Sequence, residues 1–316
     1  MMKNKLIITF IYLLSFFYFN LITAVIGNEV HIVLKIEDEI VTNLDIIKEK
    51  NYLIALNNSL SKINQNQLET LAKNSIIKEK IKKKELIKYY DLEKASSIME
   101  NLIIDLSKKL NFRNQEELNK YLLNFNLDID EIKEKLKIEA LWNQLIYDRF
   151  IDQVSIDEKK LRDYLKTEIE YSSNQLYEYH LSEILFELNA NETPEQKYNL
   201  IIENIEEAGF KNASNIYSIS ESSKFGGEIG WINKTQLSKS IIKEIEKIEV
   251  GKLTRAIQVG NNFMILRIND KRKINKKINF DEELKKLIIF EKNKQLNQLS
   301  LIYFNKIKQN IFISEL

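Results

Sequence analysis

The feature that most constrains this chain is a cluster of glycines in a sequence that otherwise avoids them. Only seven glycines and one proline occur in 316 residues, yet Gly226, Gly227 and Gly230 fall close together. Glycine is needed where the backbone angle φ is positive or where another backbone passes very close. The cluster therefore predicts a tightly turned segment that enters a strand, and it lacks the spacing of a GxGxxG phosphate-binding loop.

A second set of turns follows the glycine cluster. The run Phe225-Gly226-Gly227-Glu228-Ile229-Gly230-Trp231 is followed by a helical segment, by Val250-Gly251-Lys252-Leu253, and by two strand-like runs around Gly260-Asn261-Asn262. Such a turn between two strand-like runs is typical of a β-hairpin. This order of parts resembles the parvulin (PpiC) type of peptidyl-prolyl isomerase domain. The resemblance implies an α+β sheet domain over residues 176–274.

The first 27 residues have the pattern of an export signal. Two lysines precede an apolar run over residues 6–22, and small residues follow. A basic start, an apolar middle and a small-residue end predict a signal peptide over residues 1–27, cleaved after Gly27 or Ala24. The alternative is an uncleaved anchor, since the apolar run is near the lower limit of length for crossing a bilayer.

Residues 28–175 are expected to form a helical domain behind a short strand hairpin. Apolar residues recur every three or four positions through most of this stretch, which is typical of amphipathic helices. Ser155 and Glu158 are spaced as a capping box at the start of its last helix. The run NFRNQEELNKYLLNFNLDIDEIKEKLKIEALWNQLIYDRF, and the order of elements around it, resemble the N-terminal domain of SurA-type periplasmic chaperones. In that family this helical domain forms a cradle for unfolded outer-membrane proteins.

The remaining segments complete an α+β architecture. Thr193 and Gln196 form a capping box around the only proline, and Gly209 is expected in the left-handed conformation that ends this helix. Residues 275–316 are expected to form a long helix, about 281–308, followed by a short strand. In the SurA family the C-terminal helix packs back on the N-terminal domain. The expected fold is thus a helical SurA-N-like chaperone domain, one parvulin-like domain and a long C-terminal helix.

Composition excludes some functions. Lys and Arg total 47 against 46 Asp and Glu, a net charge of +1, so no global field favours nucleic acid as a partner. The lysine-rich run over residues 80–84 is expected to be a solvated helix face. The sequence has no cysteine, which excludes disulfides and thiol chemistry. No metal-ligand spacing, phosphate loop or nucleophile–base pair is found in the sequence, so we expect no cofactor and no metal.

The parvulin resemblance implies a polar cluster above an apolar pocket, usually two histidines with an Asp or Cys. By motif, Glu183 stands where the first histidine belongs and Met264 where the second belongs. The acidic or thiol position falls on Ser220 or Glu221. His180 is expected on the opposite strand face from Glu183. The cluster is therefore degenerate, and Glu183 is either a hydrogen-bonded or pKa-raised groove residue or a tolerated strand residue at the groove edge.

The apolar pocket implied by the resemblance is better kept than the polar cluster. Ile229, Leu237 and Ile241 match positions that line it, and these three residues and Leu185 are expected to bind the substrate. An enzyme can lower the barrier to prolyl rotation, ~18–20 kcal/mol without a catalyst, by holding the ring in an apolar pocket and desolvating the amide. Loss of both histidines argues against efficient catalysis, while slow catalysis by desolvation stays open.

Two functions from different classes follow from these patterns. The first is an exported, periplasmic folding factor that binds unfolded or extended polypeptides, outer-membrane protein precursors among them, with the parvulin domain as a binding and scaffold module. The second is an active parvulin-type prolyl isomerase, tethered to the inner membrane if the signal is not cleaved. An apolar groove without a charge code predicts extended, aromatic-rich clients.

Overall fold

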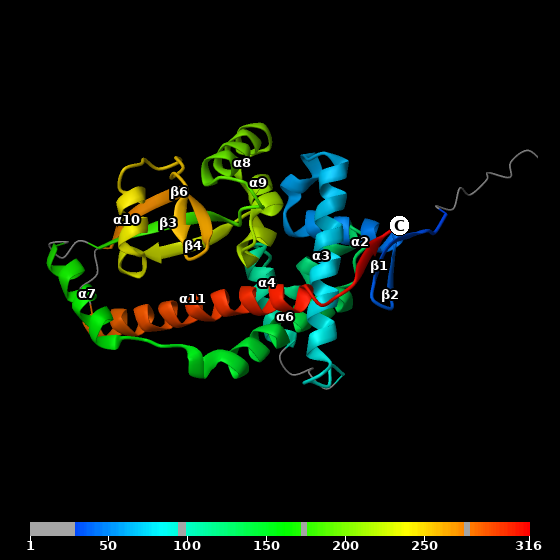
Figure 1. Cartoon of the computed structure of the whole chain (residues 1–316), viewed down its shortest axis with the longest axis horizontal. Coiled ribbons are helices and arrows are strands. Elements are labelled where there is room, and N and C mark those ends of the chain that lie inside the picture. The colour runs from blue at the N-terminus through cyan, green and yellow to red at the C-terminus, as the bar shows by residue number, and fades with distance from the viewer. Residues whose placement is uncertain (1–28, 94–98, 172–175, 275–278) are drawn as a thin grey trace, which may run out of the picture.

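The protein folds into two antiparallel sheets connected by helices (Figure 1). The computed structural model describes four stretches: residues 29–93, 99–171, 176–274 and 279–316. The expected signal peptide over residues 1–27 and the last residues of the expected helical domain, 172–175, lie outside the described residues. Across the four stretches, none of the helices combines the length and apolar character needed to cross a membrane.

The first sheet has three short strands in the order β2-β1-β7. β1 (Ile32–Ile36) pairs with β2 (Glu39–Thr42) and with β7 (Ile313–Glu315), both antiparallel. The last strand therefore lies beside the first described strand, which confirms the short final strand. Thr42 caps the following helix, and its N–H donates to the carboxylate of Asp45 at 2.8 Å.

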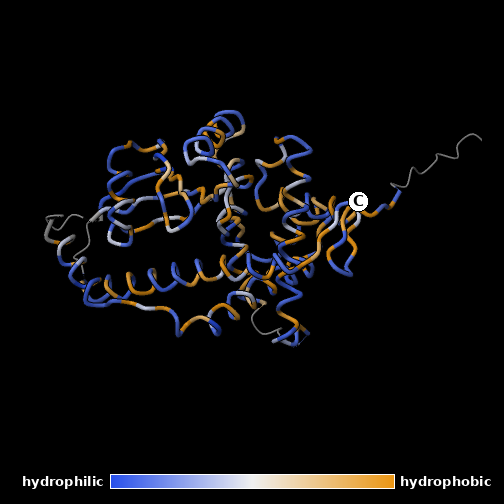
Figure 2. The backbone as a smooth tube through the Cα atoms, viewed as in Figure 1, coloured by the Kyte–Doolittle hydropathy of each residue, from blue (hydrophilic) through white to orange (hydrophobic). Residues whose placement is uncertain are grey.

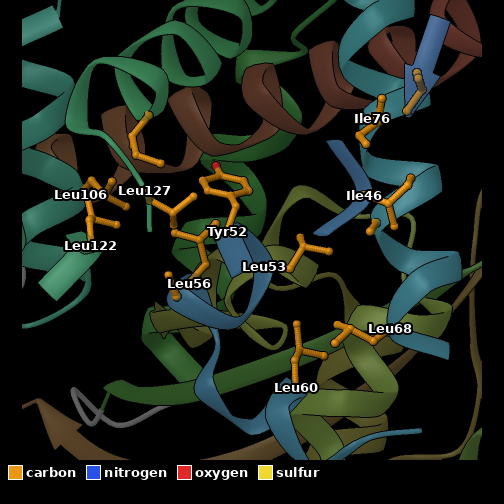
Figure 3. Close-up of a cluster of buried hydrophobic side chains, with 14 of the residues drawn as sticks. Ile46, Tyr52, Leu53, Leu56, Leu60, Leu68, Ile76, Leu106, Leu122 and Leu127 are labelled. Carbon is orange, nitrogen blue, oxygen red and sulfur yellow. The ribbon is translucent and has the colours of Figure 1, made fainter. Parts of the chain in front are cut away.

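A large apolar core lies among the first helices of the helical part (Figure 3). Most of its buried leucines and isoleucines come from the faces of α2, α3, α4 and α5 and from the start of α6, as their periodicity predicts. Asn114 and Asp128 cap α5 and α6 through their side chains. The helices, with two short 3-10 turns, are α2 (Asn43–Leu56), η1 (Asn58–Lys62), α3 (Gln65–Leu86), α4 (Met99–Lys109), α5 (Gln115–Leu123), α6 (Ile129–Phe150), η2 (Ile151–Gln153) and α7 (Glu158–Tyr171).

The expected capping box at Ser155 is wrong. α7 begins at Glu158, and Asp157 accepts a hydrogen bond from the N–H of Lys160 at 2.9 Å. Ser155 is instead tied to the C-terminal helix, because its N–H and carbonyl both bind the side-chain amide of Gln295, at 3.2 and 3.0 Å. A contact distant in sequence thus overrides the local capping pattern.

The second sheet has four antiparallel strands in the order β4-β3-β6-β5. One face packs against α8 and α9 and the other against α10. The predicted hairpin is present, and Val259 pairs with Asn262 across the turn. The elements in sequence order are β3 (Leu176–Phe186), α8 (Pro194–Ala208), α9 (Phe210–Tyr217), η3 (Glu221–Phe225), β4 (Glu228–Asn233), η4 (Lys234–Gln236), α10 (Lys239–Ile245), β5 (Ile257–Val259) and β6 (Asn262–Ile274).

The helix start at Thr193 is confirmed, and the conformation expected at Gly209 is corrected. Thr193 and Gln196 form a complete capping box with proline at the first helical position. Gly209 has φ 86° and ψ 158°, so its φ is positive but its ψ is extended rather than left-handed helical. The reason is that α9 begins at the very next residue, and Gly209 must redirect the backbone straight into it.

The long C-terminal helix α11 (Phe280–Lys308) runs beneath the four-stranded sheet to the helical part (Figure 1). Its first half buries Leu284 and Leu287 against α7. Further along, Leu296 is buried with α6, and Tyr303 stacks on Trp142 with ring centroids 5.8 Å apart. The helix therefore packs back on the N-terminal half, as the resemblance implied, and the fold is α+β.

Candidate functional site

Glu183 is hydrogen-bonded on the face of the sheet that packs against α10. By strand alternation, this face carries Glu183 along with the buried residues Tyr179 and Leu181. The hydroxyls of Ser220 and Ser222 both donate to one oxygen of the Glu183 carboxylate, at 2.6 and 2.9 Å. Hydrogen bonds to a carboxylate satisfy a charge that would otherwise be costly to shield from water.

Gly227 supports Glu183 through the backbone. The Glu183 N–H donates to the carbonyl of Gly227 at 2.8 Å, and the Ser214 hydroxyl donates to the Glu183 carbonyl at 3.2 Å. Gly227 has φ +82°, and a Cβ placed on it would stand 2.4 Å from the Glu183 carbonyl oxygen. This is the close backbone approach that the glycine cluster predicts, and no side chain fits there.

The two candidates for the third polar position are separated by the structure. Ser220 contacts Glu183, whereas Glu221 turns toward the helical part and forms ion pairs with Lys78 and Lys82. Ser222 also donates to Glu183, although the family motif does not point to this residue. Its signal in the sequence is the Ser220-x-Ser222 spacing, which places two hydroxyls at the start of the 3-10 turn η3.

An ionic network ties η3 to the helical part. Lys82 of α3 contacts Glu139 of α6 at 2.5 Å and Glu221 of η3 at 3.4 Å. Lys224 contacts the same two carboxylates at 2.8 and 3.1 Å, and Lys78 also pairs with Glu221. The Lys82 side chain is only 2 % exposed, so the expectation of a solvated lysine face is wrong at this position. The reason is that α6 and η3 cover this side of α3.

Burial and the neighbouring charges shift the pKa values of Glu221, Glu139 and Lys82. Burial alone would raise the pKa of Glu221, but Lys82, Lys224 and Lys78 hold that pKa well below its ordinary value of 4.5. The pKa of Glu139 is also lowered: burial opposes this, but Lys82 and Lys224 prevail. Burial lowers the pKa of Lys82 below 10.5 despite the attraction of Glu221 and Glu139. The two carboxylates thus offset part of the effect of burial on Lys82.

The apolar positions of the site gather around one cluster. Ile229, Ile241 and Met264 are half-buried and pack against it, while Leu237 is 5 % exposed and belongs to its core. The Leu237 carbonyl also accepts a hydrogen bond from the Tyr164 hydroxyl of α7 at 3.1 Å. Leu237 is therefore a buried support of this face.

β3 also carries Leu185 and His180. Leu185 is half-buried and pairs with Met264 in the strand register. His180 lies away from Glu183, with its Nε2 3.1 Å from a carboxylate oxygen of Glu228 and its ring 5.2 Å from that of Trp231. His180 therefore lies on the opposite face of β3 from Glu183, as expected. Among the described residues, no three His, Asp or Glu side chains are grouped so that they could hold a metal ion.

The family of this sheet follows from comparison with known domains. Residues 183–270 match the family model described as Rotamase: PPIC-type PPIASE domain. This protein has a PpiC-type parvulin domain. The match begins at Glu183 and ends in β6, so it contains each of the polar positions discussed above. Within the matched residues, Glu183 brings a carboxylate, Ser220 and Ser222 bring hydroxyls, and Met264 brings a thioether.

Sequence similarity extends beyond the parvulin domain. The protein is 26 % identical over 153 residues to Chaperone SurA of Pseudomonas putida, covering 46 % of this chain and 36 % of the relative. It is 25 % identical over 210 residues to Chaperone SurA of Pectobacterium atrosepticum, covering 58 % of this chain and 49 % of the relative. The match therefore spans about half the length, or less, of these curated relatives.

Solved structures show a weak overall likeness. PrsA from Bacillus subtilis aligns with a TM-score of 0.29 and 16 % identity, covering 88 % of this chain and 92 % of that one. One SurA-like chaperone structure from Campylobacter jejuni, described with PEB4 and Cj1289, aligns with a TM-score of 0.28 and 16 % identity, covering 73 % and 92 %. Likeness at this level says nothing about activity.

Proposed function

We propose that this protein is a folding factor that binds unfolded polypeptides, with its parvulin domain serving mainly as a binding and scaffold module. The observation that carries the proposal is the reach of the similarity to SurA chaperones. The parvulin match covers residues 183–270 alone, whereas the alignment to the relative from Pectobacterium atrosepticum covers 58 % of the sequence. The similarity to a chaperone therefore extends from the sheet into the helical part.

Exposed apolar surface on α11 supports this proposal. Leu284, Leu287 and Leu296 are its buried residues, although the helix is 29 residues long. Ile289 and Ile302 are 58 % and 65 % exposed, and Figure 2 shows hydrophobic residues recurring along the whole helix. A long helix with unburied apolar side chains offers adaptable contacts for an unfolded polypeptide.

We further propose export to the periplasm, with outer-membrane protein precursors among the clients. Support for export comes from the basic, apolar and small-residue order of residues 1–27. The SurA resemblance implies unfolded outer-membrane proteins as clients. The exposed isoleucines would make apolar contacts with segments rich in aromatic side chains. Anchoring to the inner membrane by an uncleaved signal is the alternative, and the mass of the mature N-terminus distinguishes the two.

Charging the two exposed isoleucines of α11 should weaken client binding. We expect the double variant Ile289→Glu with Ile302→Glu to bind a fluorescent unfolded outer-membrane protein at least about fivefold less tightly. The reason is that each isoleucine that a client covers contributes roughly 1.5–3 kcal/mol through burial of its apolar surface. Fluorescence anisotropy gives the affinity, and light scattering at equal molar ratio gives the suppression of aggregation.

The matched control is Asn293→Glu with Asn297→Glu. These residues are exposed on the same helix, so the control adds the same two charges without removing apolar surface. It should retain both binding and suppression. Equal loss in the two double variants would show that charge alone is responsible, and no suppression by the unaltered protein would refute the proposed function.

The parvulin match favours prolyl isomerisation as the second candidate function. Because the polar set around Glu183 has no imidazole, we expect the rate for a short X-Pro peptide to stay near background. The measurement is a protease-coupled isomerisation assay with the full-length protein, the variant Glu183→Gln and the variant Met264→Ala. A rate well above background that either variant removes, with the fold intact by circular dichroism, would establish an active isomerase.

A further inference from the structure

A pocket lies where the C-terminal ends of three helices meet, away from the parvulin sheet. It opens among the last turn of α11, the ends of α3 and α6 and the turn between β1 and β2, and its volume is about 320 Å³. Figure 1 shows α11 crossing α3 and α6 in this region. A volume at the lower end of the range of ligand sites fits one or two residues of a longer polypeptide.

Cationic side chains outnumber carboxylates around this pocket. Four cations line it, one at the end of α3, one just after that helix, and one each on α6 and α11. They face the carboxylates of Glu37 and Glu85. Each carboxylate already has a lysine: Lys84 lies 3.6 Å from Glu37, and Lys88 lies 2.5 Å from Glu85. The other two cations are not part of these two ion pairs.

Those two cations are Arg149 and Lys306. Within the described parts of the protein, neither forms an ion pair with a carboxylate. Arg149 is instead held by tyrosines: it donates to the Tyr89 hydroxyl at 3.2 Å, and its guanidinium lies 4.8 Å from the ring centre of Tyr303. A guanidinium fixed in this way keeps donors free for the two oxygens of a planar anion.

The walls of the pocket are partly apolar. Tyr89 is 50 % exposed, and Ile307 and Ile311 are half-buried beside it. Tyr303 itself is fixed, because its hydroxyl donates to the buried carboxylate of Glu85 at 2.5 Å. An anion that enters beside Arg149 would thus have its attached carbon atoms against aromatic and aliphatic side chains.

We propose that this pocket binds a carboxylate of an extended polypeptide, with the adjacent apolar side chain against Tyr89. The proposal rests on the proposed function for the class of ligand, and on the pocket for its chemistry. The carboxylate has two sources, the C-terminus of a polypeptide or an acidic side chain, and both present the same two oxygens. Arg149 supplies the paired donors and Lys306 supplies a second charge.

The test uses the full-length protein and three fluorescent peptides of one apolar, aromatic sequence. The first has a free C-terminal carboxylate, the second a C-terminal amide, and the third an amide with one internal glutamate. We expect the free acid to bind about tenfold more tightly than the plain amide, the size of effect of one charge-assisted interaction. If the glutamate peptide matches the acid, side chains are also accepted.

The variant Arg149→Gln with Lys306→Gln should remove this preference. Both residues are exposed, so we expect the fold to survive, and thermal unfolding checks that. The matched control is Lys292→Gln, which removes a partly exposed cation of α11 that contacts Tyr147 outside the pocket. The preference should persist in the control.

Three results would overturn the proposal. Equal affinity for all three peptides in the unaltered protein would remove the carboxylate site while leaving the proposed function in place. A preference that survives in Arg149→Gln with Lys306→Gln would place the site elsewhere. Absence of binding by all three peptides would also refute the pocket, and the aggregation assay then decides separately on the proposed function.

Discussion

Replacing Gly227 with alanine is expected to disrupt the parvulin domain. The added Cβ would stand 2.4 Å from the Glu183 carbonyl oxygen and 2.6 Å from the Ser214 hydroxyl, and φ is +82°. Left-handed strain and overlap with fixed backbone together are expected to lower the free energy of unfolding by at least about 3 kcal/mol. Urea denaturation followed by tryptophan fluorescence, to which Trp231 on the adjacent strand β4 contributes, measures this change.

Gly230→Ala provides the matched control. Gly230 also has a positive φ, +81°, but nothing stands within 4 Å of the position of its Cβ. Only conformational strain remains, so we expect a loss of about 1–2 kcal/mol. Similar losses for Gly227→Ala and Gly230→Ala would show that strain, and not the contact with Glu183, is what requires glycine here.

The second large effect is expected in the ionic network between η3 and the helical part. Glu139→Gln leaves the buried Lys82 ammonium with Glu221 alone, at 3.4 Å. We expect a loss of about 3 kcal/mol in the free energy of unfolding, because an incompletely paired buried charge keeps its desolvation penalty. Urea denaturation at pH 7 gives the value.

Lys82→Met is the informative partner of that variant. It removes the buried charge and keeps an unbranched side chain of similar size. Glu139 then retains Lys224 at 2.8 Å, and Glu221 retains Lys224 and Lys78. We expect stability to change by less than about 1 kcal/mol. A larger loss in Lys82→Met than in Glu139→Gln would contradict the view that pairing of Lys82 is what Glu139 contributes.

The sequence determined those features that local chemistry fixes. Gly227 was identified because no other residue tolerates a close backbone approach with positive φ. Thr193 was identified because a capping box satisfies helix N–H groups within four residues of one another. The position of Glu183 within the sheet followed from strand alternation, which places it on the opposite face from His180.

The contacts between segments distant in sequence are seen only in the tertiary structure. The local sequence does not distinguish Ser220 from Glu221, because either side chain could contact a residue of β3. Glu221 turns away because it forms ion pairs with Lys78 and Lys82 of α3 and with Lys224 of η3. Lys82 has the sequence pattern of a solvated residue, yet η3 and α6 cover it. Ser155 has the local pattern of a cap but binds Gln295 of α11. Backbone geometry and capping are set over a few residues, whereas burial and ion pairing depend on which distant segments the fold brings alongside.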